Sequence, residues 1–261
     1  MYPEINLGPL TLQTFGLMFA LAFIVGGVIA YKRFEELGKP ADWAYEAVFA
    51  ALIGGLLGAR LYFVIDNSAE IDGLADLVSG SGLTWYGGAA GGAIGVLLWA
   101  WWRKTLNLQL TDVTAPALAA GYAVGRIGCQ LSGDGDYGKP WDGPWAMNYE
   151  DGVVPTPPGV EVHPTPIYET LVMGLAAVVL WRLRDRFRVG ILFAIYLVIA
   201  GTERFLVEFV RTNDEVFLSL TVAQLSSVVV VLAGIIWIAV VRNRYGSLAP
   251  APADGTAASV R

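Results

Sequence analysis

The stretch LQTFGLMFALAFIVGGVIAY, residues 12–31, decides the class of protein to which this chain belongs. It holds no charged residue over 20 positions, and about 20 apolar residues are what an α-helix needs to cross the hydrocarbon core of a bilayer. Lys32 and Arg33 follow the apolar run and Glu4 precedes it, which is the reverse of the charge order in a cleavable signal peptide. We therefore predict a membrane-spanning helix that persists in the mature protein.

Six further apolar stretches follow, and together with the first they predict an all-α fold, a bundle of seven transmembrane helices. These six are residues 44–65, 84–102, 113–131, 166–183, 190–210 and 220–241. The composition agrees, because 55% of the 261 residues are hydrophobic and only 15% are charged, with a mean hydropathy of +0.55. Such a composition excludes a soluble globular enzyme and a disordered chain.

The basic residues predict the orientation of the bundle. Of the 17 Lys and Arg, twelve lie in alternate connections or in the C-terminal tail, two (Lys139 and Arg211) lie on the opposite side, and three lie inside spans. Because cytoplasmic loops are enriched in Lys and Arg, we expect the N-terminus outside and the C-terminus in the cytoplasm. The twelve are Lys32, Arg33, Lys39, Arg103, Lys104, Arg182, Arg184, Arg186, Arg188, Arg242, Arg244 and Arg261.

We expect residues 1–245 to form one integral membrane domain, and residues 246–261, rich in Ala, Pro, Ser and Gly, to form a disordered cytoplasmic tail. Within the domain, residues 132–162 are too polar and too rich in proline to span the membrane. Apolar anchors such as Trp141 and Tyr149 favour a small external cap there. A loose loop with tryptophans at the membrane interface is the alternative.

Charge and residue counts exclude several other functions. One cysteine and one histidine are too few for an intramolecular disulfide framework or a zinc site, so we expect neither a metal nor a cofactor. A formal charge of −6 argues against a nucleic-acid partner, because phosphate binding needs a basic face. We expect the protein to be a monomer.

Glycines recur every four residues in three of the spans, a spacing that lets transmembrane helices pack closely. Gly87 and Gly88 also open the third span from the outside, where free backbone N–H groups could hold an anion. The glycines at this spacing are Gly54 and Gly58, then Gly87, Gly91 and Gly95, and finally Gly121 and Gly125.

Ionisable residues inside the spans are the main functional signal. A charge at the centre of a bilayer costs about 2.5 to 3.5 kcal/mol even on the lenient insertion scale, so these residues need pairing, water or a function. Each functional candidate among them lies in the outer part of its predicted helix. On that side Tyr86 begins one inward-running span, and His163 and Glu169 lie at the start of another. We therefore predict a polar pocket near the outer membrane–water interface. The ionisable residues are Arg60, Arg126, Glu203, Arg204 and Glu208.

Several of these residues have a structural interpretation beside the functional one. Arg204, Glu208 and Arg211 place plus, minus and plus along one helical stripe, which equally suits a clamp between helices. Arg126 stands in the sequence Gly-Arg-Ile-Gly, which leaves room around the guanidinium for a bidentate phosphate contact. Cys129 is expected to be a small hydrophobe rather than a nucleophile, and His163 a helix cap rather than a general base.

Four motifs resemble those of the bacterial prolipoprotein diacylglyceryl transferases. Residues 125–138 (GRIGCQLSGDGDYG) are similar to the signature loop of that family, and residues 163–169 (HPTPIYE) resemble its His-Pro-Ser/Thr-Gln-Leu-Tyr-Glu element. Residues 204–211 (RFLVEFVR) resemble its Arg-x-x-x-Glu-Phe-x-Arg helix, and residues 13–18 (QTFGLM) the opening of its first span. The similarity runs in order from about Pro9 to Val241.

The resemblance implies an enzyme of the bacterial cytoplasmic (inner) membrane that takes the diacylglyceryl group from phosphatidylglycerol. The enzyme would attach this group to the lipobox cysteine thiol in the signal peptide of a prolipoprotein and release glycerol phosphate. The catalytic residues it implies are Arg126, Arg204, Glu208 and Tyr86. The substrate-binding residues it implies are Arg60, Gly87, Gly88, Asp134, Gly138, His163, Tyr168, Glu169 and Arg211.

On this hypothesis Arg126 and Arg204 bind and stabilise the phosphate, while Glu208 positions Arg204. Tyr86 would hydrogen-bond the glyceryl ester region, because a phenol is a poor base at neutral pH. The thiol proton would then pass to another group, for which Glu169, Asp134 and His163 are all candidates.

The chain departs from the family pattern at positions close to the chemistry. Either another group activates the thiol, or the protein is a paralogue that uses a different acceptor or only binds lipid. A transporter is a further alternative, although the cytoplasmic half offers only Glu46 among the ionisable residues of the spans. The departures are Tyr86 for a histidine, Gln13 and Phe15 for a His/Tyr pair, Cys129 for an asparagine, and Asp134 for a glutamate with an apparent extra residue before Gly138.

Overall fold

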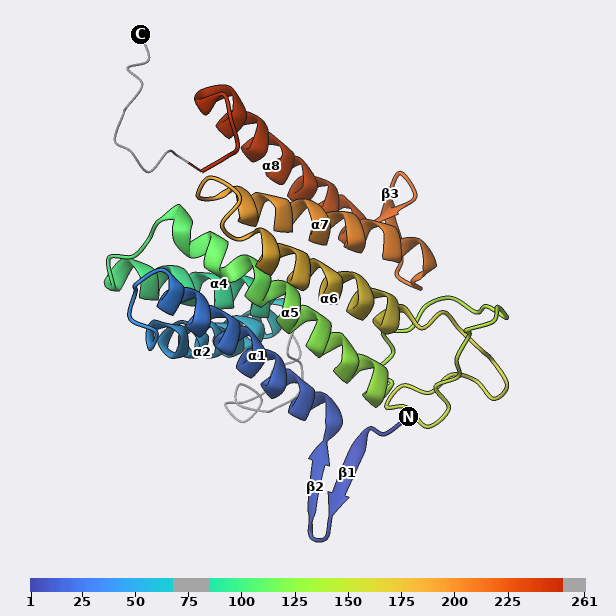
Figure 1. The fold of residues 1–261 in the computed structure, drawn as a ribbon. Helices are drawn as coiled ribbons and strands as arrows, with labels where there is room; N and C mark the ends of the chain where they lie inside the picture. Colours follow the sequence, from blue (N-terminus) through green and yellow to red (C-terminus); the bar gives the residue numbers. More distant parts are fainter. Residues whose placement is uncertain (68–84, 251–261) are drawn as a thin grey trace. The chain divides into compact units, whose positions relative to one another are not determined.

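The computed structural model describes residues 1–67 and 85–250, and the chain in these ranges is mostly helical (Figure 1). Each of the seven predicted spans coincides with one α-helix, so the helical fold class is confirmed. The helices are α1 (Thr14–Glu36), α2 (Trp43–Asp66), α4 (Trp85–Trp102), α5 (Leu108–Ser132), α6 (Thr165–Leu183), α7 (Ile191–Val207) and α8 (Val222–Tyr245), with the short 3-10 helix η1 (Glu208–Val210) after α7.

Two short antiparallel hairpins, which the sequence pattern did not predict, flank these helices. Strands β1 (Glu4–Leu7) and β2 (Leu10–Gln13) pair ahead of α1, with Glu4 opposite Gln13. Strands β3 (Glu215–Phe217) and β4 (Leu220–Thr221) pair ahead of α8. The predicted first span therefore begins as a helix only at Thr14, because the two residues before it belong to β2.

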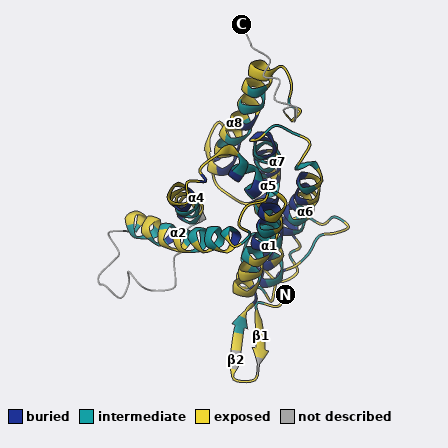
Figure 2. Ribbon diagram, turned by 60° about the vertical axis from the view of Figure 1, so that its left-hand side comes forward, coloured by how far each residue is buried: buried dark blue, intermediate teal, exposed yellow. Residues whose placement is uncertain are grey.

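Four of the described helices, α1, α2, α6 and α8, are long and apolar enough to cross a membrane. Their outward faces carry large apolar side chains, and the exposed residues follow α2 along its length (Figure 2). On α2 one stripe consists of Phe49, Ile53, Leu57 and Leu61, each more than half exposed. A continuous apolar face of this kind marks a surface that is covered by something other than water, as expected of a membrane protein.

The chain divides into two compact units. One holds residues 1–26 together with the chain from Thr111 onward, and the other is Gly27–Leu110. The first unit therefore contains the start of α1 and helices α5 to α8, whereas the second contains α2 and α4. The predicted tail lies outside the described residues from position 251 on.

In the unit Gly27–Leu110, α2 and α4 pack through glycine. A Cβ atom on Gly54 would strike the carbonyl oxygen of Gly91, and one on Gly58 would strike the carbonyl oxygen of Gly87. The same holds for Gly95, whose Cβ would strike α2 backbone. The prediction of close packing is confirmed for these glycines, because the two backbones approach to a distance that no side chain permits.

In the other unit, α5, α6 and α7 enclose a core of small and medium side chains that includes Ala119, Met173 and Leu180. Gly121 faces the backbone of α1, since its Cβ would lie 3.4 Å from the Ala22 oxygen. The packing prediction is wrong for Gly125, because a Cβ there would meet no atom within 4 Å.

Residues 133–164 form an irregular segment between α5 and α6 that is held by main-chain hydrogen bonds. Met147 and Val162 exchange both of theirs, at 3.1 and 2.9 Å, and the Trp141 amide donates to the Glu161 oxygen at 3.0 Å. Tyr149, which belongs to this segment, is fully buried. These contacts favour the compact cap over the loose loop.

Candidate functional site

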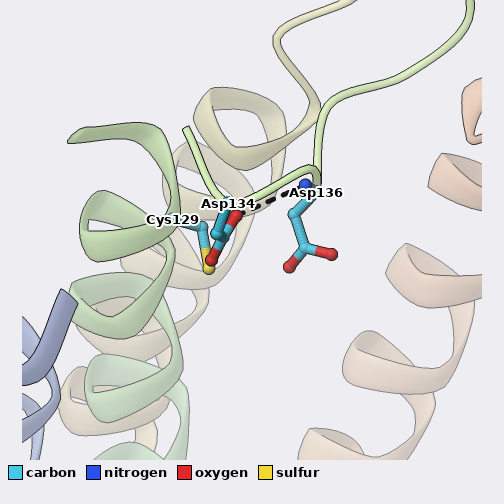
Figure 3. A group of neighbouring side chains, drawn as sticks. All are labelled: Cys129, Asp134 and Asp136. Atoms are coloured by element: carbon cyan, nitrogen blue, oxygen red, sulfur yellow. Dashed lines mark hydrogen bonds between the residues drawn. The ribbon is translucent and has the colours of Figure 1, made fainter. Parts of the chain in front are cut away.

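The signature loop begins where α5 ends. The Gly133 amide still donates to the Cys129 oxygen at 2.9 Å, and Gly133 and Gly135 have φ values of +62° and +92°. Residues with a side chain rarely adopt such values, so glycine permits the chain to turn back on itself here. Figure 3 shows the result: Asp134 lies beside the Cys129 thiol on α5, and the Asp136 amide donates to Asp134 Oδ1 at 3.3 Å.

Asp136 joins two arginines from distant parts of the sequence. One carboxylate oxygen is ion-paired with Arg126 on α5 and the other with Arg211 after η1. Its main-chain oxygen accepts hydrogen bonds from Arg211 Nη1 at 3.1 Å and from Thr165 Oγ1 at 2.5 Å. Burial alone would raise the pKa of Asp136, but the two guanidinium groups outweigh it and lower the pKa to about 2. The carboxylate is therefore charged at neutral pH.

Glu169 on α6 is the second carboxylate between the same two arginines. It is 0% exposed, pairs with Arg126 Nε, lies 3.3 Å from Arg211 Nη1, and accepts a hydrogen bond from the Tyr122 hydroxyl. Every nitrogen of the Arg126 guanidinium thus has a partner, because Nη2 also donates to Tyr122 at 3.1 Å. These contacts make Glu169 an anchor for two arginines.

The predicted stripe of Arg204, Glu208 and Arg211 is present, although α7 ends at Val207 and the stripe continues through η1. Arg204 Nη2 lies 2.9 Å from Glu208 Oε2, and Arg211 Nε lies 3.9 Å from the same oxygen. Glu208 Oε1 accepts hydrogen bonds from Asn213 and Thr221, which hold the carboxylate from the α8 side. Glu208 is therefore fixed between two cations.

Two donors of this stripe are buried and have no hydrogen-bond partner among residues 1–67 and 85–250. They are Arg204 Nη1 and Arg211 Nε, and the Glu208 Oε2 atom between them also lacks a hydrogen bond of good geometry. An unsatisfied buried donor on a charged group costs free energy. Both arginines already contact Glu208, so their unsatisfied donors are candidates for binding an additional acceptor.

Main-chain contacts at Gly138 bring the three motifs of this unit together. The Gly138 amide donates to the His163 oxygen at 2.8 Å, and the next amide, that of Lys139, donates to the Val210 oxygen at 2.7 Å. A Cβ atom at Gly138 would strike the Val210 oxygen. Glycine at this position is therefore what permits the signature loop to lie directly on η1 and on the start of α6.

His163, Tyr168 and two tryptophans form a separate aromatic group. The His163 ring stacks on Trp141 at 4.4 Å, and its Nδ1 lies 3.2 Å from the Tyr168 hydroxyl, to which Trp145 Nε1 donates at 2.8 Å. Burial lowers the pKa of His163. The imidazole is therefore neutral at pH 7, and its contacts with Trp141 and Tyr168 agree with a packing role at the start of α6.

Four predicted site residues belong to the other unit. Arg60 lies near the end of α2, with its guanidinium 5.1 Å from the centre of the Phe63 ring. Tyr86, Gly87 and Gly88 open α4 at the same end of the α2–α4 pair, because Gly87 packs on Gly58. Tyr86 is 46% exposed. Within this unit the structure does bring these residues to one end.

Sequence reasoning missed two residues of the arginine cluster and left a third without a role. Asp136 was assigned no role, because only Asp134 of the two loop aspartates aligns with the family glutamate. Tyr122 gave no signal beyond its position one turn before Arg126. Glu203 was recognised as a costly charge in a span but received no function. The Asp-Gly-Asp spacing was the signal that could have found Asp136.

Cys129, Asp134 and Asp136 also offer a thiol and two carboxylates whose ligand atoms lie within 4.8 Å of one another, a donor set that could hold a metal ion (Figure 3). Arg126 Nη1 is already paired with Asp136 and lies 3.7 Å from Cys129 Sγ. The Arg126 guanidinium therefore already provides Asp136 and Cys129 with the positive charge that a bound cation would supply.

The fold and the site together define a helical membrane protein with a buried cluster of three arginines and three carboxylates, assembled from α5, α6 and the end of α7. Comparison with known proteins gives the family. Residues 4–240 match the family model described as prolipoprotein diacylglyceryl transferase. The chain belongs to this family.

Relatives named phosphatidylglycerol–prolipoprotein diacylglyceryl transferase cover most of the chain. The protein of Clostridium tetani is 32% identical over 87% of this chain and 92% of its own length. That of Chromohalobacter salexigens is 33% identical over 90% and 91%, and that of Paraburkholderia phymatum 31% identical over 93% of each. The resemblance inferred from the four motifs is thereby confirmed.

Proposed function

We propose that this protein transfers the diacylglyceryl group of phosphatidylglycerol to the lipobox cysteine of a prolipoprotein. Family membership and the names of the relatives support the donor and the acceptor. The reaction forms a bond between the cysteine sulfur and the glyceryl carbon that carries the phosphate. It breaks the bond from that carbon to the phosphate oxygen, and the thiol proton ends on the released glycerol phosphate.

The membrane arrangement that we propose is a multi-pass protein of the bacterial cytoplasmic membrane with seven spans, an outside N-terminus and a cytoplasmic C-terminus. Its support is the seven-helix pattern together with the bias of basic residues toward alternate connections. In that orientation the ends of α5 and α7 and the start of α6, which carry the arginine cluster, lie at the outer side. The site would then face the leaflet from which an outer-face enzyme draws its lipid.

The observation that carries the proposal is that Arg204 Nη1 and Arg211 Nε are buried and make no hydrogen bond within the part of the chain that the structure describes. A phosphodiester offers two anionic oxygens, and arginine binds such groups through parallel hydrogen bonds. An anionic oxygen of the headgroup would satisfy such a donor on either arginine. The same donors would stabilise the charge that develops on the departing phosphate.

Arg126 takes a different part in this proposal from the one that the sequence suggested. Its three guanidinium nitrogens are bound to Asp136, Glu169 and Tyr122. We therefore assign the phosphate to Arg204 and Arg211, and we assign to Arg126 the fixing of the two carboxylates that orient Arg211. Arg126 is a positioning residue on this view.

Asp134 is the candidate acceptor of the thiol proton that the geometry favours. Burial, aided by the neighbouring Asp136, raises the pKa of Asp134, so it is a stronger base than an ordinary aspartate. It is partly exposed, and it does not pair with an arginine in the described part of the chain. Glu169 is less suited, because two arginines and a hydroxyl already use its oxygens.

Transfer can be tested with the purified protein in detergent, phosphatidylglycerol and a synthetic lipobox peptide. We expect the peptide to gain the mass of one diacylglyceryl group, and Arg204→Ala to remove this gain. Arg242→Ala is the matched control, because Arg242 is exposed at the far end of α8. A folded wild-type protein that leaves the peptide unmodified would refute the proposed reaction.

The second candidate function is a paralogue that moves the lipid group to another acceptor or binds lipid without turnover. Tyr86 in place of the family histidine is the observation that favours it. Complementation of a bacterial strain that lacks its own transferase separates the two candidates. Growth supports the lipoprotein reaction, whereas failure to grow with a correctly inserted protein supports the paralogue.

A further inference from the structure

Glu203, on the last turns of α7, is a buried carboxyl group to which the proposed mechanism gives no task. It is 8% exposed. In the described part of the chain it has neither an ion pair nor a side-chain hydrogen bond. A carboxylate left in this state would pay a large desolvation cost, so its chemical state requires an explanation.

The surroundings of Glu203 are the arginine cluster itself. Its neighbours on α5, α6 and α7 and after η1 are charged or phenolic, whereas α8 has no titratable side chain before Arg242. The groups that interact with it electrostatically are Tyr122, Arg126, Glu169, Tyr196, Arg204 and Arg211.

The charges of the cluster already balance without Glu203. Three guanidinium groups face three carboxylates in direct ion pairs, and a fourth carboxylate would leave one uncompensated negative charge inside the protein. Buried charges without a counter-ion are avoided by neutralisation. Glu203 is therefore present as the neutral carboxylic acid. The balanced groups are Arg126, Arg204 and Arg211 against Asp136, Glu169 and Glu208.

We propose that Glu203 holds a proton in the resting protein and donates it to the phosphate oxygen that leaves during diacylglyceryl transfer. The assignment rests on the proposed function. The Glu203 carboxyl group interacts electrostatically with the guanidinium groups of Arg204 and Arg211, the two arginines to which we assign the phosphate. An acid at this place can protonate the oxygen while the guanidinium groups hold the other phosphate oxygens.

The step balances without any further reactant. The sulfur–carbon bond forms as the carbon–oxygen bond breaks, and the electron pair of the broken bond stays on the phosphate oxygen. That oxygen takes the proton of Glu203, and the resulting carboxylate is reprotonated by the proton that the attacking thiol has lost. No group is oxidised or reduced, and the cluster returns to charge balance after each turnover.

Glu203→Gln is the test variant, because glutamine has the shape of the acid and the same zero charge. We expect unchanged thermal stability and unchanged KM for phosphatidylglycerol, with kcat lowered by about 100-fold or more, the usual contribution of a general acid. In the wild type, activity should fall at high pH as the acid ionises, and the variant should lack this limb. Glu215→Gln, in an exposed strand, is the control. A variant that keeps full kcat, or that unfolds readily, overturns the assignment.

An infrared measurement tests the proton without relying on activity. At neutral pH the wild type and Glu215→Gln should both show the carbonyl stretch of a protonated carboxylic acid, and Glu203→Gln should lack it. Absence of this band in the wild type overturns the inference even if transfer is observed. Presence of the band in a wild type that transfers no lipid refutes the proposed function and the donor role, while the protonated state stands.

Discussion

Replacement of Asp136 by asparagine tests whether the arginine cluster holds the three motifs together. The pKa of Asp136 is about 2 instead of its ordinary 3.8. This difference of about 1.8 units corresponds, at 1.36 kcal/mol per unit, to roughly 2.4 kcal/mol in favour of the charged form. Because the side chain is 31% exposed, solvent screening reduces this figure, and we take about 2 kcal/mol as its contribution at neutral pH.

Loss of one partner from a buried ion pair costs about 3 to 5 kcal/mol. Glu169 remains beside both Arg126 and Arg211 in Asp136→Asn, so we expect a smaller loss, of about 2 to 3 kcal/mol. Denaturation in mixed detergent micelles measures it. Asp151→Asn, an exposed acid of the cap, is the control and should change stability by less than about 0.5 kcal/mol.

The pH dependence gives the same prediction a second readout. A carboxylate with a lowered pKa in the folded state stabilises the protein above its unfolded pKa, and this contribution disappears as the pH falls toward the folded pKa. The wild type should therefore lose stability relative to Asp136→Asn between about pH 4 and pH 2. Equal stability of Asp136→Asn and Asp151→Asn at pH 7, or parallel acid curves for the wild type and Asp136→Asn, would refute the reasoning.

Three further predictions follow from the packing, a helix cap and the histidine. Gly91→Val should destabilise the protein by about 1 to 3 kcal/mol or more because its side chain meets the α2 backbone, whereas Gly125→Ala, with open space around it, should be neutral or stabilising in the same thermal assay. Thr221→Ala removes the capping box of α8 and a 2.9 Å hydrogen bond to Glu208, so about 1 to 2 kcal/mol of unfolding free energy should be lost; unchanged unfolding would contradict the cap. The single imidazole, His163, should titrate by NMR below its ordinary 6.5, and full protonation at pH 7 would contradict its burial.

The helices could be predicted from sequence because uninterrupted apolar length is a strong signal. The hairpins could not, since strands of two to four residues are too short to show an alternation that stands out from the adjoining apolar spans. The sequence predicted that the ionisable residues of the spans need partners, but it did not identify most of those partners. That Arg204 pairs with Glu208 follows from helical spacing, whereas the pairing of Arg126 with Glu169 depends on how α5 lies against α6, which no local pattern encodes.

Asp136, and not the predicted Asp134, pairs with the arginines, and this difference has a geometric cause. The loop is held at one end by the hydrogen bond that closes α5 at Gly133, and at the other by Gly138, whose contact with Val210 tolerates no side chain. With both ends fixed, the two positive-φ glycines determine how the residues between them turn. The carboxylate that reaches the arginines is then set by its distance from Gly138, which selects Asp136.

Asp134 is displaced by the same geometry from the arginines to the Cys129 thiol, where burial raises its pKa. The two aspartates should therefore respond differently to the same substitution. Asp134→Asn removes no ion pair with an arginine in the described part of the chain and should leave stability within about 1 kcal/mol of the wild type, while transfer activity should fall if Asp134 accepts the thiol proton. A loss of stability as large as that of Asp136→Asn would mean that both aspartates bind the arginine cluster, and the division of roles within the loop would be wrong.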